Sequence, residues 1–114
     1  MSDCLFCGIA NGQIKANIVH QDETVLAFKD IAPKAPVHIL IIPRKHVVSV
    51  LDIEASDHGL IGRIFQVAGR LAREHGIADS GFRVVVNSGA DAGQSVFHLH
   101  YHLLGGRRMS WPPG

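Results

Sequence analysis

The sequence predicts an α+β domain whose strands form an antiparallel sheet. A long amphipathic helix pattern lies near the middle of the chain, and apolar segments of strand length lie on both sides of it. Only a short loop separates the last two segments, and short loops join antiparallel neighbours, whereas parallel strands need a longer crossover. The chain has 114 residues, 46% of them hydrophobic and 18% charged, which is typical of one globular domain, here residues 1–114.

The first half of the chain contains three predicted elements. Residues 4–11 predict a short helix or turn that Gly12 closes. Residues 25–29 predict a strand that ends in an Asp-Ile-Ala-Pro turn. Residues 38–42 predict a second strand, which stops at Pro43 because proline lacks the N–H that a sheet ladder needs.

The long helix is predicted to follow Ser56 and Asp57, two favoured N-cap residue types. Its apolar residues recur at three-to-four spacing, which places them on one helical face: Leu60, Ile61, Ile64, Phe65, Ala68, Leu71 and Ala72. Gly76 suits the left-handed position that closes a helix. We therefore expect one long helix with one side buried on the sheet.

Residues 82–87 and 95–104 predict the last two strands, joined by a glycine-rich loop over residues 88–93. Alternate side chains of a strand share a face, so the last strand is expected to project three imidazoles from one side: His98, His100 and His102. The opposite side is expected to pack under the helix through Phe97, Leu99, Tyr101 and Leu103.

Three imidazoles on one face indicate a functional site, because every buried imidazole has two polar nitrogens that need partners. The residues leave two chemistries open: zinc binding through neutral imidazoles, and nucleophilic catalysis by one histidine whose neighbours set its tautomer. The preceding Gly93-Gln94-Ser95 offers N–H groups and a hydroxyl for phosphate oxygens. No carboxylate lies in the strand to support a hydrolytic zinc ion, so phosphoryl chemistry is favoured.

Residues 93–107, Gly-Gln-Ser-Val-Phe-His-Leu-His-Tyr-His-Leu-Leu-Gly-Gly-Arg, resemble the His-x-His-x-His-x-x signature (x apolar) of the histidine triad (HIT) superfamily. The resemblance covers nearly the whole chain, including residues 4–7, 26–33, 35–38 and 111–114, and is closest to the Hint branch of purine nucleoside phosphoramidases. It implies a five-stranded antiparallel sheet with one long and one short helix. It also implies a homodimer that joins two sheets into one of ten strands, with Trp111 reaching the partner's active site.

The resemblance implies a role for each matching residue. His100 would be the nucleophile that forms a nucleotidyl-histidine, supported by His38 and flanked by His98 and His102. Ser95 would hydrogen-bond a phosphate oxygen or the leaving amine, and a flanking histidine that stays protonated would neutralise phosphate charge. The remaining nucleotide contacts would come from Phe28, Asp30, Ile31, Asn87, Gly93 and Gln94, with Asp30 taking the ribose hydroxyls.

Cys4 and Cys7 form a Cys-x-x-Cys pair that has three interpretations. A partly buried thiol pair is the simplest, and a thioredoxin-like redox motif is disfavoured because its βαβ context is missing. The third is structural zinc, which some proteins of the resembled family bind through such a pair and two histidines, here His46 and His98. A zinc-bound His98 would not also relay protons, so its two implied roles conflict.

The expected function is hydrolysis of purine nucleoside 5′-phosphoramidates to a nucleoside monophosphate and an amine, with no cofactor required for catalysis. Two alternatives stay open: a dinucleoside polyphosphate hydrolase, and a zinc- or nucleotide-binding interaction module with incidental catalysis. The formal net charge of +1 and the lack of a basic run argue against strong nucleic-acid binding. Without a visible signal peptide or membrane-spanning run, we expect no membrane partner and a cytoplasmic location.

Overall fold

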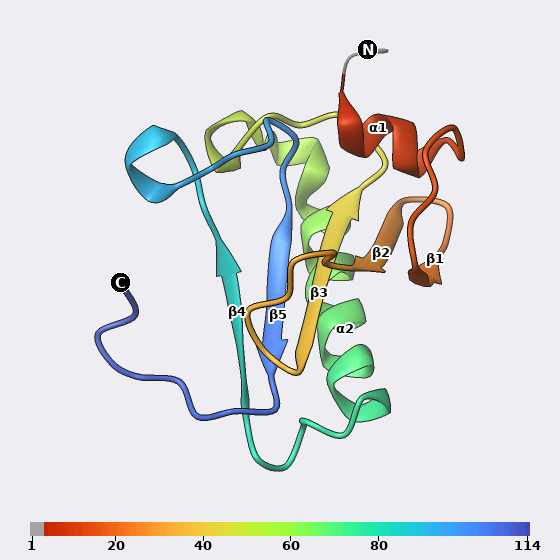
Figure 1. Ribbon diagram of the computed structural model, residues 1–114. Helices are drawn as coiled ribbons and strands as arrows, with labels where there is room; N and C mark the ends of the chain where they lie inside the picture. The colour runs from red at the N-terminus through yellow and green to blue at the C-terminus, as the bar shows by residue number, and fades with distance from the viewer. Residues whose placement is uncertain (1–3) are drawn as a thin grey trace.

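A five-stranded antiparallel sheet forms the centre of the computed structural model, which describes residues 4–114 (Figure 1). In spatial order its strands are β1 (Ile18–Gln21), β2 (Val25–Lys29), β3 (Val37–Pro43), β5 (Tyr101–Gly105) and β4 (Phe82–Val86). Because β3 and β5 are neighbours, with Leu40 opposite His102 and His38 opposite Leu104, two histidines that are far apart in the sequence meet at the middle of the sheet.

The two faces of the sheet are covered by helices of very different length (Figure 1). The 17-residue helix α2 (His58–Glu74) covers the larger core, which includes Ile39, Ile41, Ile64, Val67, Leu71, Tyr101 and Leu103. The six-residue helix α1 (Leu5–Ala10) contributes to a smaller core with Phe6, Ile9, Leu26, Phe28, Leu40 and Ile42. The central strands β2 and β3 are therefore buried on both faces, which explains their unbroken apolar sequences.

Three short 3-10 helices occupy the connections: Val50–Asp52, Ala55–Asp57 and Ala90–Ala92. The predicted long helix is confirmed, with Asp57 at the N-cap position and Gly76 in the left-handed region at φ +74° after its end. The Asp57 carboxylate does not cap α2. It accepts hydrogen bonds from the Lys45 Nζ at 2.8 Å and from the Glu54 N–H at 2.9 Å.

The strand predicted over residues 95–104 is wrong in its first half, because β5 begins only at Tyr101. The register that pairs Ile41 with Tyr101 would place Pro43 opposite Leu99, and proline has no N–H to continue the ladder. Leu99 N–H instead donates to the Val47 carbonyl at 2.6 Å. Phe97, predicted to pack under the helix, is 59% exposed as a consequence of this irregular backbone.

The edge strand β1 was absent from the elements predicted by residue pattern, although the family resemblance implied a fifth strand. It has only four residues, and of these only His20 is buried, so it carries no apolar alternation. Among residues 4–114, no helix combines the length and the apolar character that crossing a bilayer requires.

Candidate functional site

A pocket of about 420 Å³ lies between α1 and the sheet face that α2 leaves free. Its walls are mostly apolar and come from α1 and the central strands: Leu5, Phe6, Ile9, Phe28 and Leu40. Four of the sequence-predicted polar residues also line it: Asp30, Ser95, His100 and His102. An apolar cavity with a few convergent polar groups is typical of a small-molecule site.

His100 lies in the irregular segment just before β5 and is buried. Its Nδ1 lies 2.7 Å from the His98 backbone carbonyl, and because a carbonyl only accepts, Nδ1 must carry the hydrogen. The other ring nitrogen, Nε2, therefore keeps its lone pair. His100 lines the pocket, so this is the tautomer that a nucleophilic imidazole requires.

His38 and His102 form a hydrogen-bonded pair whose tautomers are set by the backbone. The Lys34 N–H donates to His38 Nδ1 at 3.0 Å, so the ring hydrogen of His38 is on Nε2. That Nε2 lies 2.9 Å from His102 Nδ1 and 3.4 Å from an Asp30 carboxylate oxygen. Because His102 Nδ1 accepts, its own hydrogen is on Nε2, and His102 presents an N–H donor.

Both members of this pair are held neutral. Burial, followed by the neighbouring imidazoles of His100 and His38, lowers the pKa of His102 to about 4 against the opposing carboxylate of Asp30. Burial also lowers the pKa of His38, again opposed by Asp30. The lowered pKa values favour the neutral form of both rings, so His102 is a neutral N–H donor, in contrast to the protonated flanking histidine that the resemblance implied.

Three residues that the resemblance assigns to the nucleoside line the cavity: Phe28, Asp30 and Ile31. Phe28 is buried and packs edge-to-face on Phe6, with ring centroids 5.4 Å apart. Ile31 stands at the rim and is 99% exposed, and Asp30 uses one carboxylate oxygen to accept the Ala32 N–H at 2.8 Å. Residue patterns missed Phe6, although Leu5, Phe6 and Ile9 have the spacing of one short helical face.

The loop residues predicted to hold phosphate divide into two groups. Ser95 is exposed to the pocket, whereas the cavity lining does not include Asn87, Gly93 or Gln94. The Gln94 side chain is buried and structural: its Oε1 accepts the Gly89 N–H at 2.9 Å, and its Nε2 donates to the Val48 carbonyl at 2.7 Å. Trp111 is 81% exposed and stacks on Arg83 of β4, outside the pocket lining.

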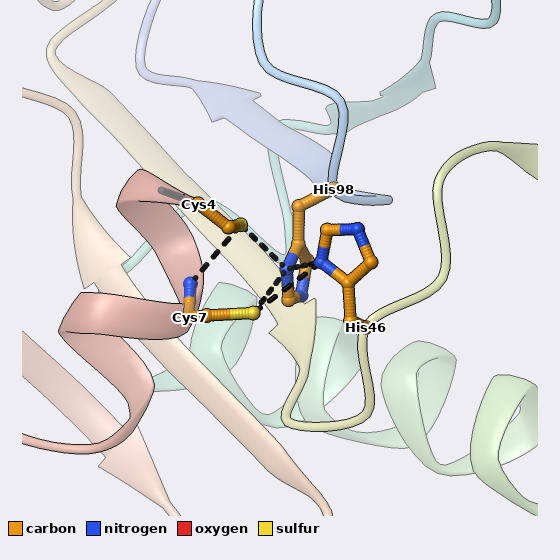
Figure 2. Close-up of side chains that lie close together, drawn as sticks. All are labelled: Cys4, Cys7, His46 and His98. Atoms are coloured by element: carbon orange, nitrogen blue, oxygen red, sulfur yellow. Dashed lines mark hydrogen bonds between the residues drawn. The ribbon is translucent and has the colours of Figure 1, made fainter. Parts of the chain in front are cut away.

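A thiol–imidazole cluster, defined here as Cys4, Cys7, His46 and His98, lies beside the pocket (Figure 2). Its four donor atoms all lie within 4.8 Å of one another. Cys4 Sγ is 3.3 Å from His98 Nδ1, Cys7 Sγ is 3.3 Å from His46 Nδ1, and the two Nδ1 atoms are 3.2 Å apart. Two sulfurs and two imidazole nitrogens match the tetrahedral ligand set of structural zinc, so this cluster could bind a zinc ion.

The orientation of His98 supports the same conclusion. Its Nε2 lies 2.7 Å from the Pro43 carbonyl, which fixes the ring hydrogen on Nε2 and leaves the Nδ1 lone pair facing the sulfurs. Its side chain is therefore directed at the cluster, and the pocket lining does not include it. His98 and His100 both contact the Phe6 ring of α1, so His98 lies on the α1 side of the sheet together with His100, but its Nδ1 faces the thiols and not the pocket.

Comparisons with known proteins agree with this architecture. The profile of the HIT domain matches residues 11–109. An uncharacterized HIT-like protein of Synechocystis sp. is 48% identical over 112 residues, which are 98% of this chain and 97% of that protein. A HIT family hydrolase from Legionella pneumophila superimposes with a TM-score of 0.96 at 48% identity, over 98% of this chain and 100% of that one. A histidine triad nucleotide-binding protein from Candida albicans gives a TM-score of 0.82 at 29% identity, over 96% and 83% of the two chains.

Proposed function

This chain belongs to the HIT domain family, and from that premise we propose that it is a hydrolase that cleaves the P–N bond of purine nucleoside 5′-phosphoramidates. One observation carries the proposal. At one pocket, His100 offers an imidazole lone pair while the neighbouring His102 offers an N–H. A nucleophile beside a neutral hydrogen-bond donor is suited to attack on a phosphorus whose oxygens gain charge. The Candida albicans relative, named for nucleotide binding, supports a nucleotide as the ligand.

The proposed reaction has two displacements at the α-phosphorus. In the first, a bond forms between His100 Nε2 and phosphorus, the P–N bond of the substrate breaks, and the amine leaves with a proton from solvent. In the second, water attacks phosphorus, the bond to His100 breaks, and the proton of water returns to solvent. His102 Nε2–H and the Ser95 hydroxyl hydrogen-bond the phosphoryl oxygens, and positioning of this kind is the main contribution an enzyme makes to phosphoryl transfer.

In this proposal the nucleoside occupies the apolar part of the pocket. The base packs among Phe28, Phe6 and Ile31, and the ribose hydroxyls bind Asp30. Gly93, Gln94 and Asn87 do not line the pocket, so in this proposal they would reach the phosphate only after a movement of their loop. Catalysis needs no metal in this scheme, and the zinc that the thiol–imidazole cluster could hold is structural.

Substrate competition tests the proposal. We expect a higher kcat/KM for adenosine 5′-phosphoramidate than for a diadenosine polyphosphate, because in this proposal one nucleoside and its α-phosphate fill the pocket of about 420 Å³. A preference for the polyphosphate would reassign the protein to the dinucleoside polyphosphate hydrolases. Turnover of neither compound, with AMP binding intact, would favour the interaction module.

We further propose that the active form is a homodimer joined along β4, with Trp111 directed toward the partner's pocket. β4 is an edge strand of the sheet, and two of its apolar side chains are exposed, Phe82 at 41% and Val86 at 37%. Phe65 of α2, which packs on Tyr101 of the neighbouring β5, is 51% exposed. Pairing two such edges would cover these groups and satisfy the free strand hydrogen bonds. Light scattering of the purified protein should give twice the chain mass, and Val86→Lys should give a monomer. A monomeric wild type would overturn the dimer.

A further inference from the structure

Helix α1 belongs to both the thiol–imidazole cluster and the nucleotide pocket. Cys4 is its N-cap residue, and the Cys7 N–H donates to Cys4 Sγ at 3.3 Å. The side chains of Leu5, Phe6 and Ile9, on the same short helix, form one wall of the pocket. Figure 2 shows that both thiols come from α1. Any group that fixes the two thiols therefore also fixes the side of α1 that forms the wall.

Phe6 is the most direct connection between the two sites. Its ring contacts His98 of the cluster at 6.0 Å, His100 of the pocket at 5.1 Å and Phe28 of the pocket at 5.4 Å, measured between ring centroids. A second connection runs through the backbone, because the His98 carbonyl holds the Nδ1–H of His100 at 2.7 Å. One residue of the cluster thus orients the proposed nucleophile.

Helix α1 has little else to hold its first turn. Six residues are too few for a helix that is stable without tertiary contacts. Its last residue is held by Arg44, which donates to the Ala10 carbonyl at 2.6 Å. Within the part of the chain that the structure describes, the hydrogen bonds that Cys4 and Cys7 make outside α1 go to His46 and His98. The apolar contacts of Phe6 and Ile9 supply the remainder.

We infer that metal binding at the thiol–imidazole cluster and nucleotide binding in the pocket are thermodynamically coupled through α1, with Phe6 as the positioning residue that carries the coupling. The inference rests on the proposed function for the identity of the nucleotide. Zinc would bind the helix in its docked position, in which the pocket wall is complete and His100 is oriented. A ligand that binds the docked state better shifts the equilibrium toward it, so each ligand should raise the affinity for the other.

Linkage makes the inference quantitative, because the two effects must be equal in size. Calorimetry with AMP, which has no P–N bond to cleave, should give a Kd about tenfold or more lower for zinc-loaded than for chelator-treated, reduced protein. In a second experiment, which starts from folded zinc-loaded protein, saturating AMP should raise the zinc affinity measured against a competing chelator by the same factor. Hydrogen exchange of residues 4–12 should slow when zinc is added.

Two variants separate coupling from a general loss of stability. Phe6→Ala should keep zinc binding, and the ratio of its AMP affinities with and without zinc should shrink to within about twofold. The lost contact between Phe6 and the base lowers both affinities and leaves their ratio unaffected. Leu71→Ala, a large-to-small truncation in the core on the other face of the sheet, should retain the full ratio.

Three results would count against the inference. Equal AMP affinity in the two forms, or zinc affinity that AMP does not change, would overturn the coupling and leave the proposed function standing. An unchanged ratio in Phe6→Ala would overturn the role of Phe6. AMP that binds neither form would overturn the proposed function, and the coupling with it.

Discussion

The thiol–imidazole cluster and the His38–His102 pair show how one backbone group decides what an imidazole can do. In the cluster, the Pro43 carbonyl accepts a hydrogen bond from His98 Nε2–H, so the other nitrogen, Nδ1, faces the sulfurs with its lone pair. In the pair, the Lys34 N–H occupies Nδ1 of His38, so the opposite nitrogen presents a hydrogen to His102. When a backbone carbonyl accepts the hydrogen of one ring nitrogen, the other nitrogen keeps a lone pair and can act as a metal ligand or nucleophile. When a backbone N–H donates to one ring nitrogen, the other nitrogen carries the hydrogen and acts as a donor.

This difference separates two groups that both have metal-binding composition. Asp30, His38 and His102 bring three potential ligand atoms within 4.8 Å of one another, as the thiol–imidazole cluster does with four. A metal at His38 Nε2 would need a lone pair there while the Lys34 N–H still occupies the other nitrogen, which only an imidazolate provides. We therefore interpret these three residues as a hydrogen-bonded chain that orients His102, and the cysteine-containing group as the metal site.

The largest effect is expected at His100, whose Nδ1–H donates to the His98 carbonyl, so that Nε2 presents a lone pair. His100→Asn should lower turnover by several orders of magnitude, because the covalent route is lost. AMP affinity should stay within about tenfold, or about 1.4 kcal/mol. Rapid quench of the wild type with labelled phosphoramidate should yield an acid-labile adduct on His100. An adduct on His98 or His102 would show that the backbone partner does not select the nucleophile.

A smaller effect is expected at His102, which presents an N–H and, in the proposed mechanism, forms no bond to phosphorus. His102→Ala should lower kcat by about 10²–10³-fold, as is typical when one preorganised donor is removed from a transition state. His102→Gln keeps an N–H donor and should recover part of that loss. Equal losses for His100→Asn and His102→Ala, measured under single turnover, would contradict the division of roles.

The next test asks which of the two candidate metal sites holds zinc: the thiol–imidazole cluster or the group of Asp30, His38 and His102. Purified wild type should contain about one zinc ion per chain, Cys4→Ser should contain none, and His38→Ala should be unchanged. Loss of the metal from Cys4→Ser should also lower the thermal midpoint, by about 4 °C for each kcal/mol of stability lost. Elemental analysis that finds zinc in Cys4→Ser, or loses it in His38→Ala, would place the metal at the other group.

Residue patterns predicted the elements whose side chains are buried periodically, such as α2 and the central strands β2 and β3. They could not predict where β5 begins, because that depends on Pro43 of another strand lying opposite its extension. The predicted alternation nevertheless extends to His98, because its ring contacts α1 as His100 does, while Leu99 between them joins the core under α2. The contact between His38 and His102 depends on β3 and β5 being neighbours, which no local pattern specifies.

The identity of the site residues was predictable to different degrees. The resemblance to the histidine triad family named His100 and the four residues of the thiol–imidazole cluster, and the structure places both groups in arrangements suited to their chemistry. Neither pattern nor resemblance indicated the Lys34 N–H or the Pro43 carbonyl, because a backbone group has no signature in the residue type. The tautomers, which decide the chemistry, are visible only in the folded chain.

The smallest expected effect is on the pH dependence of stability, and it tests the low pKa of His102. Its folded pKa of about 4 lies below the unfolded value of about 6.5, so the unfolded chain takes up the proton first as the pH falls. Stability is therefore nearly full above pH 6.5 and is lost as the pH falls from 6.5 toward 4, by about 3 kcal/mol for this group. His102→Gln removes the titrating ring, and denaturant unfolding should show a shallower decline over the same window. Because His102 shares a hydrogen bond with His38, the difference between the two curves belongs to the pair. If the stability curves of wild type and His102→Gln ran parallel, His102 would be protonated near its ordinary pKa in the folded protein. The hydrogen bond from the Lys34 N–H to His38 would then not keep the pair neutral.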